Sequence, residues 1–144
     1  MLKFPENISI IGTGFYVPDK IVTNYDLEKI VDTSDEWIVS RTGIKERRIT
    51  KDSEAASDLA LKAGSIALKK AGISSKEVDL LIIATQSPDY PLPSTACVIQ
   101  HGLGLTNAVC FDIAAACSGS IYALIVAASV MKTCNYNTAM VIGT

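Results

Sequence analysis

The chain has 144 residues, of which 49% are hydrophobic, and a net charge of −2, which suits one globular domain with a sizeable core. An acidic chain that has no basic stripe with interleaved aromatic residues is not expected to bind nucleic acid. The longest apolar run, 121–131, is shorter than the roughly 20 residues of a membrane span, and the N-terminus lacks the apolar stretch of a signal peptide. We therefore expect a soluble protein with no membrane partner.

The first half of the chain predicts three helices. The apolar residues 8–12 come before them and predict a buried first strand. Two short helices are expected next, over 25–31 and directly after the capping residues 33–35. The polar stretch 41–52 is expected to be a loop. The clearest amphipathic helix spans 53–71.

The second half alternates strands with helices. Helices are expected after Ser94 and from Ser118 to Lys132, and strands over 78–84, 108–113 and 139–144. A continuous apolar run such as 78–84 is typical of a strand that is buried on both faces of its sheet. The alternation therefore predicts an α/β fold with a mostly parallel sheet and helices on both faces.

Charged residues are concentrated at the start of the chain. Residues 1–52 carry 17 charged side chains, residues 53–90 carry nine, and the remaining residues carry two, Asp112 and Lys132. A helix over 121–131 that is apolar on every side is expected to be buried on every side. We expect a large subunit interface or further polypeptide to cover it. The chain also ends on an apolar strand, so we expect it to be incomplete.

Cys117 is the candidate nucleophile. It lies between the predicted strand 108–113 and the helix that follows, within a run of small residues. A thiol at the N-terminus of a helix faces unpaired backbone N–H groups and the positive end of the helix dipole, which favour the thiolate. Its small neighbours allow a tight turn and let a substrate reach the sulfur. Thiolates of this kind attack acyl groups.

The alternative is that Cys117 is a buried structural cysteine, which is common for this residue type. The other three cysteines lie within or at the end of predicted elements and are interpreted as structural: Cys97, Cys110 and Cys134. The spacings of 13, 7 and 17 residues give no CxxC pair, so neither a zinc site nor a dithiol redox motif is indicated. Unpaired cysteines suit the reducing cytoplasm, where we expect the protein to be.

Two stretches of the chain resemble β-ketoacyl-acyl-carrier-protein synthase III, the condensing enzyme that starts bacterial type II fatty acid synthesis. One is 32–48, which reads Asp-Thr-Ser-Asp-Glu-Trp-Ile-Val-Ser-Arg-Thr-Gly-Ile-Lys-Glu-Arg-Arg, and the other is 112–119, Asp-Ile-Ala-Ala-Ala-Cys-Ser-Gly. The landmarks Gly12 to Pro18 and Pro93-Ser94 occur in the family's order. Thiolases, chalcone synthases and hydroxymethylglutaryl-CoA synthases share the cysteine-helix layout but are not similar to 32–48.

The resemblance implies a thiolase-like fold, in which two αβαβα halves pack their nucleophile helices together at the centre. Residues 1–144 would then be one domain, the N-terminal half, with a mostly parallel mixed sheet and a buried nucleophile helix. The C-terminal half would be absent. The full-length enzyme would be a homodimer.

The resemblance also implies a reaction in two stages. Cys117 would take the acetyl group from the substrate acetyl-CoA, and its backbone N–H would help to hold the oxyanion, with no metal and no tightly bound cofactor. Malonyl-acyl-carrier-protein would then lose CO₂, and its carbanion would attack the acyl-cysteine to give acetoacetyl-acyl-carrier-protein. The family's catalytic histidine and asparagine belong to the second half, and His101 does not match them. We therefore expect this chain alone to be inactive in condensation.

CoA binding is implied for Trp37, Arg41 and Thr33. Trp37 would stack on the adenine, Arg41 would pair with a phosphate, and Thr33 would lie close to the base. The alternatives are ordinary packing of the only tryptophan and a solvated basic face. Leu92 occupies a position where many members of the family have phenylalanine, so the width of the acyl pocket, and with it the primer, stays open.

Two other functions also stay open. One is a related CoA-dependent condensing enzyme of secondary metabolism, which a carrier-protein surface in the missing half would distinguish from a fatty acid synthase. The other is a non-catalytic half-synthase that pairs with a second polypeptide or only binds CoA. A neighbouring reading frame that encodes the histidine and the asparagine would favour it.

Overall fold

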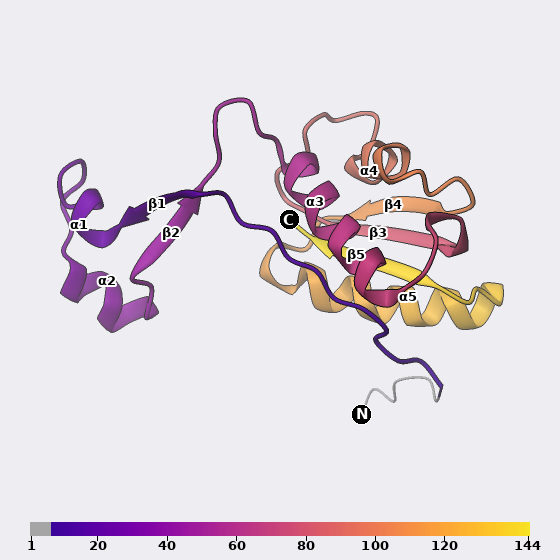
Figure 1. Cartoon of the computed structure of the whole chain (residues 1–144). Helices are drawn as coiled ribbons and strands as arrows, with labels where there is room; N and C mark the ends of the chain where they lie inside the picture. The colour runs from indigo at the N-terminus through magenta and orange to yellow at the C-terminus, as the bar shows by residue number, and fades with distance from the viewer. Residues whose placement is uncertain (1–6) are drawn as a thin grey trace. The chain divides into compact units, whose positions relative to one another are not determined.

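The computed structural model describes residues 7–144, which form two compact units (Figure 1). Unit 1 comprises the described residues up to 16 together with 56–144, and unit 2 comprises residues 17–55. Unit 1 contains a parallel sheet with three main helices, and unit 2 contains a two-stranded antiparallel sheet with two short helices.

The sheet of unit 1 has the strand order β4-β3-β5, and both strand pairs are parallel. Its strands are β3 (Leu80–Ala84), β4 (Val109–Ile113) and β5 (Ala139–Gly143). All five residues of the central strand β3 are buried. Ile82 at its middle lies opposite Phe111 on one side and Val141 on the other. The parallel sheet predicted from the alternating elements is therefore confirmed, with strand positions within two residues of those expected.

Helices cover both faces of this sheet, as predicted (Figure 1). The helices are α3 (Ala56–Ala71) and α4 (Thr95–Leu103) on one face and α5 (Gly119–Cys134) on the other, with a 3₁₀ turn at Ser75–Glu77 before β3. Leu81 and Ile83 of β3 pack in the cluster that α3 and α4 share. Leu80 and Ile82 pack against α5, because successive side chains of a strand point to opposite faces.

One carboxylate fastens the start of α4 to β4. Asp112 accepts hydrogen bonds from the backbone N–H groups of Thr95, at 2.8 Å, and of Ala96, at 2.7 Å. The hydroxyl of Ser94, the N-cap residue, accepts a further one from the N–H of Cys97. Three N–H groups that a helix leaves without intrahelical partners are thereby satisfied, and the negative charge of Asp112 also complements the helix dipole.

Within the described chain, the helix expected over 121–131 is covered by the sheet on one side only, so the cover expected for its other side is left to a subunit interface or further polypeptide. The small residues of α5 face the sheet, whereas Ile121 is 58% exposed and Tyr122 is 52% exposed. The reason is geometric: one three-stranded sheet can cover only one side of a helix. Together with the turn before it, the helix runs over Ala116–Cys134 and is long and apolar enough to cross a membrane, with 22% of its apolar window buried. Length and apolar composition are weak evidence for a membrane span, because core helices of water-soluble proteins meet the same criterion.

Residues 8–12 do not form the predicted strand. Ile10 is 76% exposed and Ile11 is 56% exposed, and the segment is not paired with any described strand. A strand needs the free backbone groups of a neighbouring strand, and this segment lies against α3 instead. Two glycines permit the approach: a Cβ atom on Gly12 would lie 2.7 Å from the carbonyl oxygen of Ala67, and one on Gly14 would overlap the backbone of α3.

Unit 2 pairs β1 (Lys20–Thr23) with β2 (Glu46–Ile49) in antiparallel fashion around α1 (Asn24–Leu27) and α2 (Asp35–Thr42). The prediction that 41–52 is a loop is therefore wrong in part, because the end of α2 and the whole of β2 lie within it. The sequence of β2, Glu-Arg-Arg-Ile, has no apolar alternation that would have indicated a strand. Buried Asn24 holds the unit together, because its amide donates to the carbonyl of Ile44, at 2.8 Å, and accepts from Arg47, at 2.7 Å.

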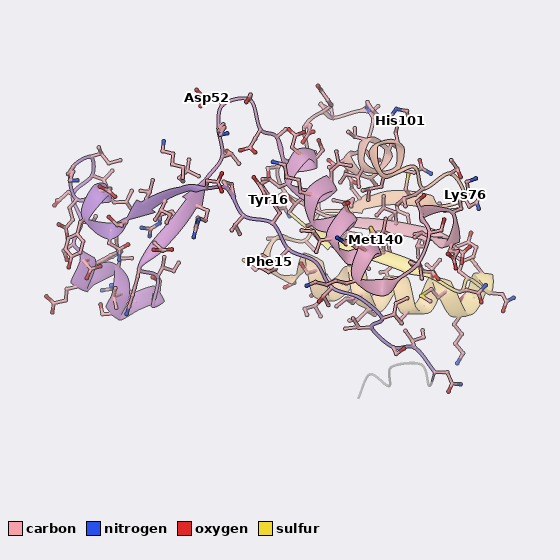
Figure 2. All side chains as sticks on the ribbon, viewed as in Figure 1. Phe15, Tyr16, Asp52, Lys76, His101 and Met140 are labelled. Carbon is pink, nitrogen blue, oxygen red and sulfur yellow. The ribbon has the colours of Figure 1, made fainter. Side chains whose placement is uncertain are left out.

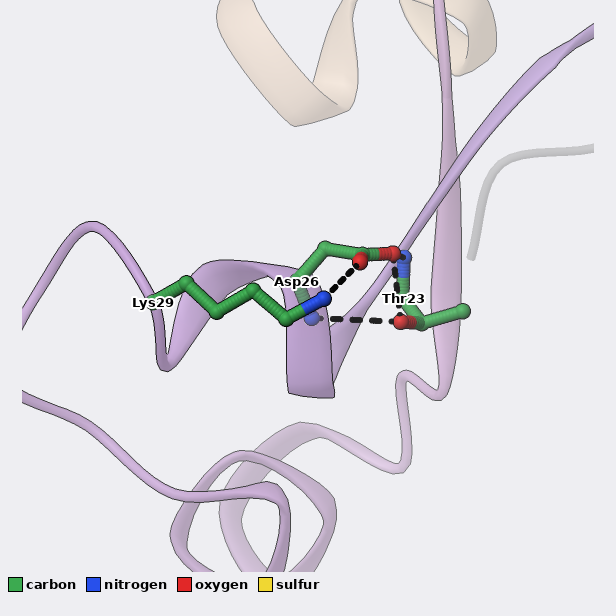
Figure 3. A network of polar contacts seen from close by, with 3 residues as sticks. All are labelled: Thr23, Asp26 and Lys29. Carbon is green, nitrogen blue, oxygen red and sulfur yellow. Dashed lines mark hydrogen bonds and ion pairs between the residues drawn. The ribbon is translucent and has the colours of Figure 1, made fainter.

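A small polar network closes the start of α1 (Figure 3). The Asp26 carboxylate accepts hydrogen bonds from the hydroxyl of Thr23, at 2.6 Å, and from its N–H, at 3.0 Å, while Lys29 donates to the same carboxylate at 2.9 Å. The bond from the Thr23 hydroxyl, followed by that from Lys29, holds the pKa of Asp26 well below its usual range. A lowered pKa means that this carboxylate stabilises the folded state at neutral pH and loses that effect as the pH falls through the lowered pKa.

Replacing Asp112 with alanine should lower the free energy of unfolding by about 1–2 kcal/mol, because two N–H groups of α4 lose their acceptor. Urea unfolding followed by circular dichroism measures the effect. The control is Asp52→Ala, since Asp52 is an exposed acid in the loop before α3 (Figure 2). Equal midpoints for the two variants would contradict the assignment of Asp112 as the cap of α4.

Candidate active site

Cys117 lies where the carboxyl ends of the three parallel strands meet the start of α5. It belongs to a 3₁₀ turn, Ala116–Ser118, that follows β4 by two residues and leads directly into the helix. The approach of α5 to the sheet is close at this end. A Cβ atom on Gly119 would lie 3.3 Å from the Cβ of Ala84, the last residue of β3, and one on Gly143 of β5 would lie 2.5 Å from the hydroxyl of Ser120. The carboxyl edge of a parallel sheet is where α/β proteins place ligands.

The turn presents the thiol to solvent. The side chain of Cys117 is exposed, and Ala116 before it has a φ of 45°, in the left-handed region that non-glycine residues seldom adopt. Two hydrogen bonds close the turn, from the N–H of Ser118 to the carbonyl of Ala115, at 3.1 Å, and from the N–H of Gly119 to the carbonyl of Ala116. Neither bond uses the N–H of Cys117.

Gln86 holds the same turn from the loop that follows β3. With its amide oxygen directed toward the turn, the orientation that satisfies both groups, it accepts hydrogen bonds from the N–H of Ala115, at 3.0 Å, and of Ala116, at 2.5 Å. Gln86 was not among the predicted site residues. Its only signal in the sequence is its position two residues past a buried strand, at the edge where the nucleophile strand also ends.

The three residues predicted to bind CoA lie together in unit 2, on α2 or just before it. The guanidinium carbon of Arg41 is 4.9 Å from the ring centre of Trp37, a cation–π distance. Thr33 and Trp37 line an open depression of about 340 Å³, with Asp32 and Ser34 beside them. Trp37 is 55% exposed, so part of its side chain is accessible to a ligand.

Two further titratable residues, His101 and Cys134, are not in the turn that holds Cys117. His101, the only histidine, has an exposed side chain in the last turn of α4 (Figure 2). Cys134 is exposed at the far end of α5 from Cys117. Within residues 7–144 no group of three or more histidine, cysteine or acidic side chains is arranged to hold a metal ion.

Comparison with known proteins shows which proteins this chain is similar to. A family model described as 3-oxoacyl-[acyl-carrier-protein (ACP)] synthase III matches residues 111–144. The β-ketoacyl-[acyl-carrier-protein] synthase III of Clostridium acetobutylicum is 56% identical over 138 residues, which cover 96% of this chain and 42% of that protein. That of Caldanaerobacter subterraneus is 54% identical over 134 residues, covering 93% and 40%. Over nearly its whole length the chain is similar to β-ketoacyl-acyl-carrier-protein synthases III. It spans about two fifths of the length of these relatives.

Solved structures agree. The 3-oxoacyl-[acyl-carrier-protein] synthase III of Aquifex aeolicus matches with a TM-score of 0.89 and 53% identity, over 93% of this chain and 43% of that one. The priming β-ketosynthase of the R1128 polyketide pathway matches with a TM-score of 0.89 and 34% identity, over 94% and 40%. The thiolase-like α/β fold implied by the sequence is therefore confirmed.

Replacing Gln86 with alanine should loosen the turn at Cys117. Each of the two N–H groups of Ala115 and Ala116 loses an acceptor worth about 1 kcal/mol, so their amide exchange should accelerate by about fivefold. Hydrogen exchange followed by NMR reads both amides directly. The matched control is Gln100→Ala, because the Gln100 amide donates to the carbonyl of Ala108 instead. Unchanged exchange at both alanines in the Gln86 variant would show that Gln86 does not hold the turn.

Proposed function

We propose that this chain carries the nucleophile of an enzyme that starts type II fatty acid synthesis, and that Cys117 accepts the acetyl group of acetyl-CoA. One observation carries the proposal: the thiol is exposed at the start of a 16-residue helix, in a turn of small residues at the carboxyl edge of the sheet. The identity to synthase III relatives along nearly the whole chain supports the reaction class.

Acyl transfer requires a nucleophile, a place for negative charge and a leaving group. The thiolate of Cys117 attacks the carbonyl carbon of acetyl-CoA, and the carbonyl oxygen becomes an oxyanion. The N–H of Cys117, which neither hydrogen bond of the turn uses, donates to that oxyanion, and the positive end of α5 favours the oxyanion. Collapse of the intermediate breaks the carbon–sulfur bond to CoA and leaves the acetyl group on Cys117.

Condensation is proposed for the whole protein, acting as a cytoplasmic homodimer. Malonyl-acyl-carrier-protein loses CO₂, and the resulting carbanion attacks the acetyl-cysteine to give acetoacetyl-acyl-carrier-protein. The histidine and asparagine of that step are not assigned to any residue of this chain, so acyl transfer is the stage that these 144 residues carry.

Trp37 and Arg41 are proposed to hold CoA, with Thr33 beside the adenine. The contact between Trp37 and Arg41 supports this, because it places a stacking face next to a fixed positive charge. Adenine would stack on the free face of the indole, and the guanidinium would pair with a phosphate.

A second candidate function is the priming of a polyketide pathway. It is favoured by the likeness to the R1128 priming ketosynthase, which is named for that role. Leu92, which is 85% exposed in the loop before α4, is the residue of this chain proposed to set the acceptable primer. Comparing acetyl-CoA with longer acyl-CoA primers as acyl donors would separate the two candidates.

Incubation with radiolabelled acetyl-CoA should place the label on Cys117. Peptide mapping after a short reaction identifies the labelled residue, and Cys117→Ser should abolish the thioester label. The matched control is Cys134→Ser, which removes an exposed thiol at the other end of the same helix and should keep full labelling. Label on another cysteine would contradict the assignment, and no label at all would favour a non-catalytic partner chain.

Replacing Trp37 with alanine should weaken CoA binding by about 1–3 kcal/mol, the value of one aromatic stacking contact with a base. Titration calorimetry measures the loss, and acetyl transfer to Cys117 should persist at saturating substrate. Tyr25→Ala serves as the control, because Tyr25 is an aromatic residue of unit 2 that is exposed to a similar extent, at 63%, and does not line the depression. An affinity that does not change would remove Trp37 from the site.

A further inference from the structure

Cys97 and Cys110 are separated by 13 residues in the sequence and are neighbours in the fold. Their sulfur atoms are 3.6 Å apart. Cys97 lies in the first turn of α4, and Cys110 lies in β4, on which that helix packs. No CxxC spacing marks this pair in the sequence, and neither thiol has a part in the proposed acyl transfer.

The two thiols have different surroundings. Cys97 is exposed, and its sulfur accepts a hydrogen bond from the hydroxyl of Ser94 at 3.2 Å. Cys110 is half-buried, and its thiol donates to the amide oxygen of Gln100 at 3.4 Å. Burial raises the pKa of Cys110 to about 11, and the hydrogen bond to Cys97 and the nearby Asp112 carboxylate act in the same direction. Cys97 is therefore the thiol that a reagent in solution meets first.

We propose that Cys97 and Cys110 form a dithiol site that reacts with small disulfides, such as glutathione disulfide, and closes to a reversible intramolecular disulfide. The thiolate of Cys97 attacks one sulfur of the oxidant, breaks its disulfide bond and releases one thiolate. Cys110 then loses its proton to solvent and attacks the sulfur of Cys97, which releases the second thiol. Two protein thiols are oxidised, and one small disulfide is reduced to two thiols.

The geometry requires little motion for this step. The sulfur atoms must close from 3.6 Å to the bonded distance of about 2.05 Å, which rotation of an exposed side chain such as that of Cys97 can provide. The new bond would tie the first turn of α4 to β4, beside the contacts that Asp112 already makes to Thr95 and Ala96. The proposal does not depend on the chemistry of Cys117.

The test is oxidation of the purified protein with glutathione disulfide in a Cys117→Ser background, which removes the other reactive candidate. No lysine or arginine lies between Cys97 and Cys110, so trypsin leaves them on one peptide, whereas chymotrypsin can cut at Leu103 and Leu105. Mass spectrometry of the chymotryptic digest should show the two cysteine peptides joined by a disulfide. A reductant should separate them.

Single variants distinguish the two roles. Cys110→Ser should trap glutathione on Cys97 as a lasting mixed disulfide, because the second thiol is missing. Cys97→Ser should slow the reaction of the remaining pair partner by at least about tenfold, since Cys110 is half-buried and protonated. Cys134→Ser is the matched control and should leave the joined peptides unchanged, and circular dichroism checks that each variant folds. Stable glutathione adducts on the unmutated pair without joined peptides, or joined peptides that involve Cys134 instead, would overturn the proposal.

Discussion

The burial of β3 on both faces and along both edges is the constraint on which unit 1 depends. Its backbone pairs with β4 and β5, and its side chains alternate between two apolar clusters. Since parallel strands in register end at one edge, the position of β3 also determines where the ends of its two neighbours lie. The candidate nucleophile follows one of those ends, so its place in space is a consequence of how the core is packed.

Two polar side chains at that edge make hydrogen bonds that apolar packing cannot supply. Asp112 in β4 caps α4, and Gln86, just after β3, binds the turn at Cys117. Each accepts hydrogen bonds from two backbone N–H groups, and those bonded to Asp112 belong to the buried residues Thr95 and Ala96. Because Asp112 and Cys117 are only five residues apart, the helix that precedes β4 and the turn that follows it are fixed by the same short stretch of chain.

The sequence was informative where local pattern and tertiary structure agree. The apolar run of β3 and the alternation of strands and helices predicted the parallel sheet, and the small residues around Cys117 predicted an open turn before a helix. Residues 8–12 misled because an apolar run does not say whether a neighbouring strand is available. The strand β2 was missed for the opposite reason, since its charged residues carry no alternation.

Contacts between residues distant in the sequence account for what sequence reasoning could not reach. Gln86 binds a turn about 30 residues further along the chain. A glutamine is equally common in any exposed loop, so its residue type does not predict this contact. Cys97 and Cys110 meet because α4 packs on β4, which no spacing rule for cysteine pairs describes. Trp37 and Arg41 contact each other because one helical turn brings residues four apart to the same face, but their predicted role came from the family resemblance and not from this spacing.

The two sides of α5 differ in a way that bears on the thiol. Its small residues Gly119, Ala123 and Ala127 lie on the sheet, while the larger apolar side chains Ile121 and Tyr122 are exposed. A helix whose only cover is one sheet usually has the opposite arrangement, with its bulky side chains inward. An exposed apolar face of this kind is typical of an interface, and a subunit contact or further polypeptide over α5 stays our prediction. Because Cys117 precedes the same helix, such a cover would also keep water from the proposed acyl transfer and strengthen the electrostatic effect of the helix dipole on the oxyanion formed there.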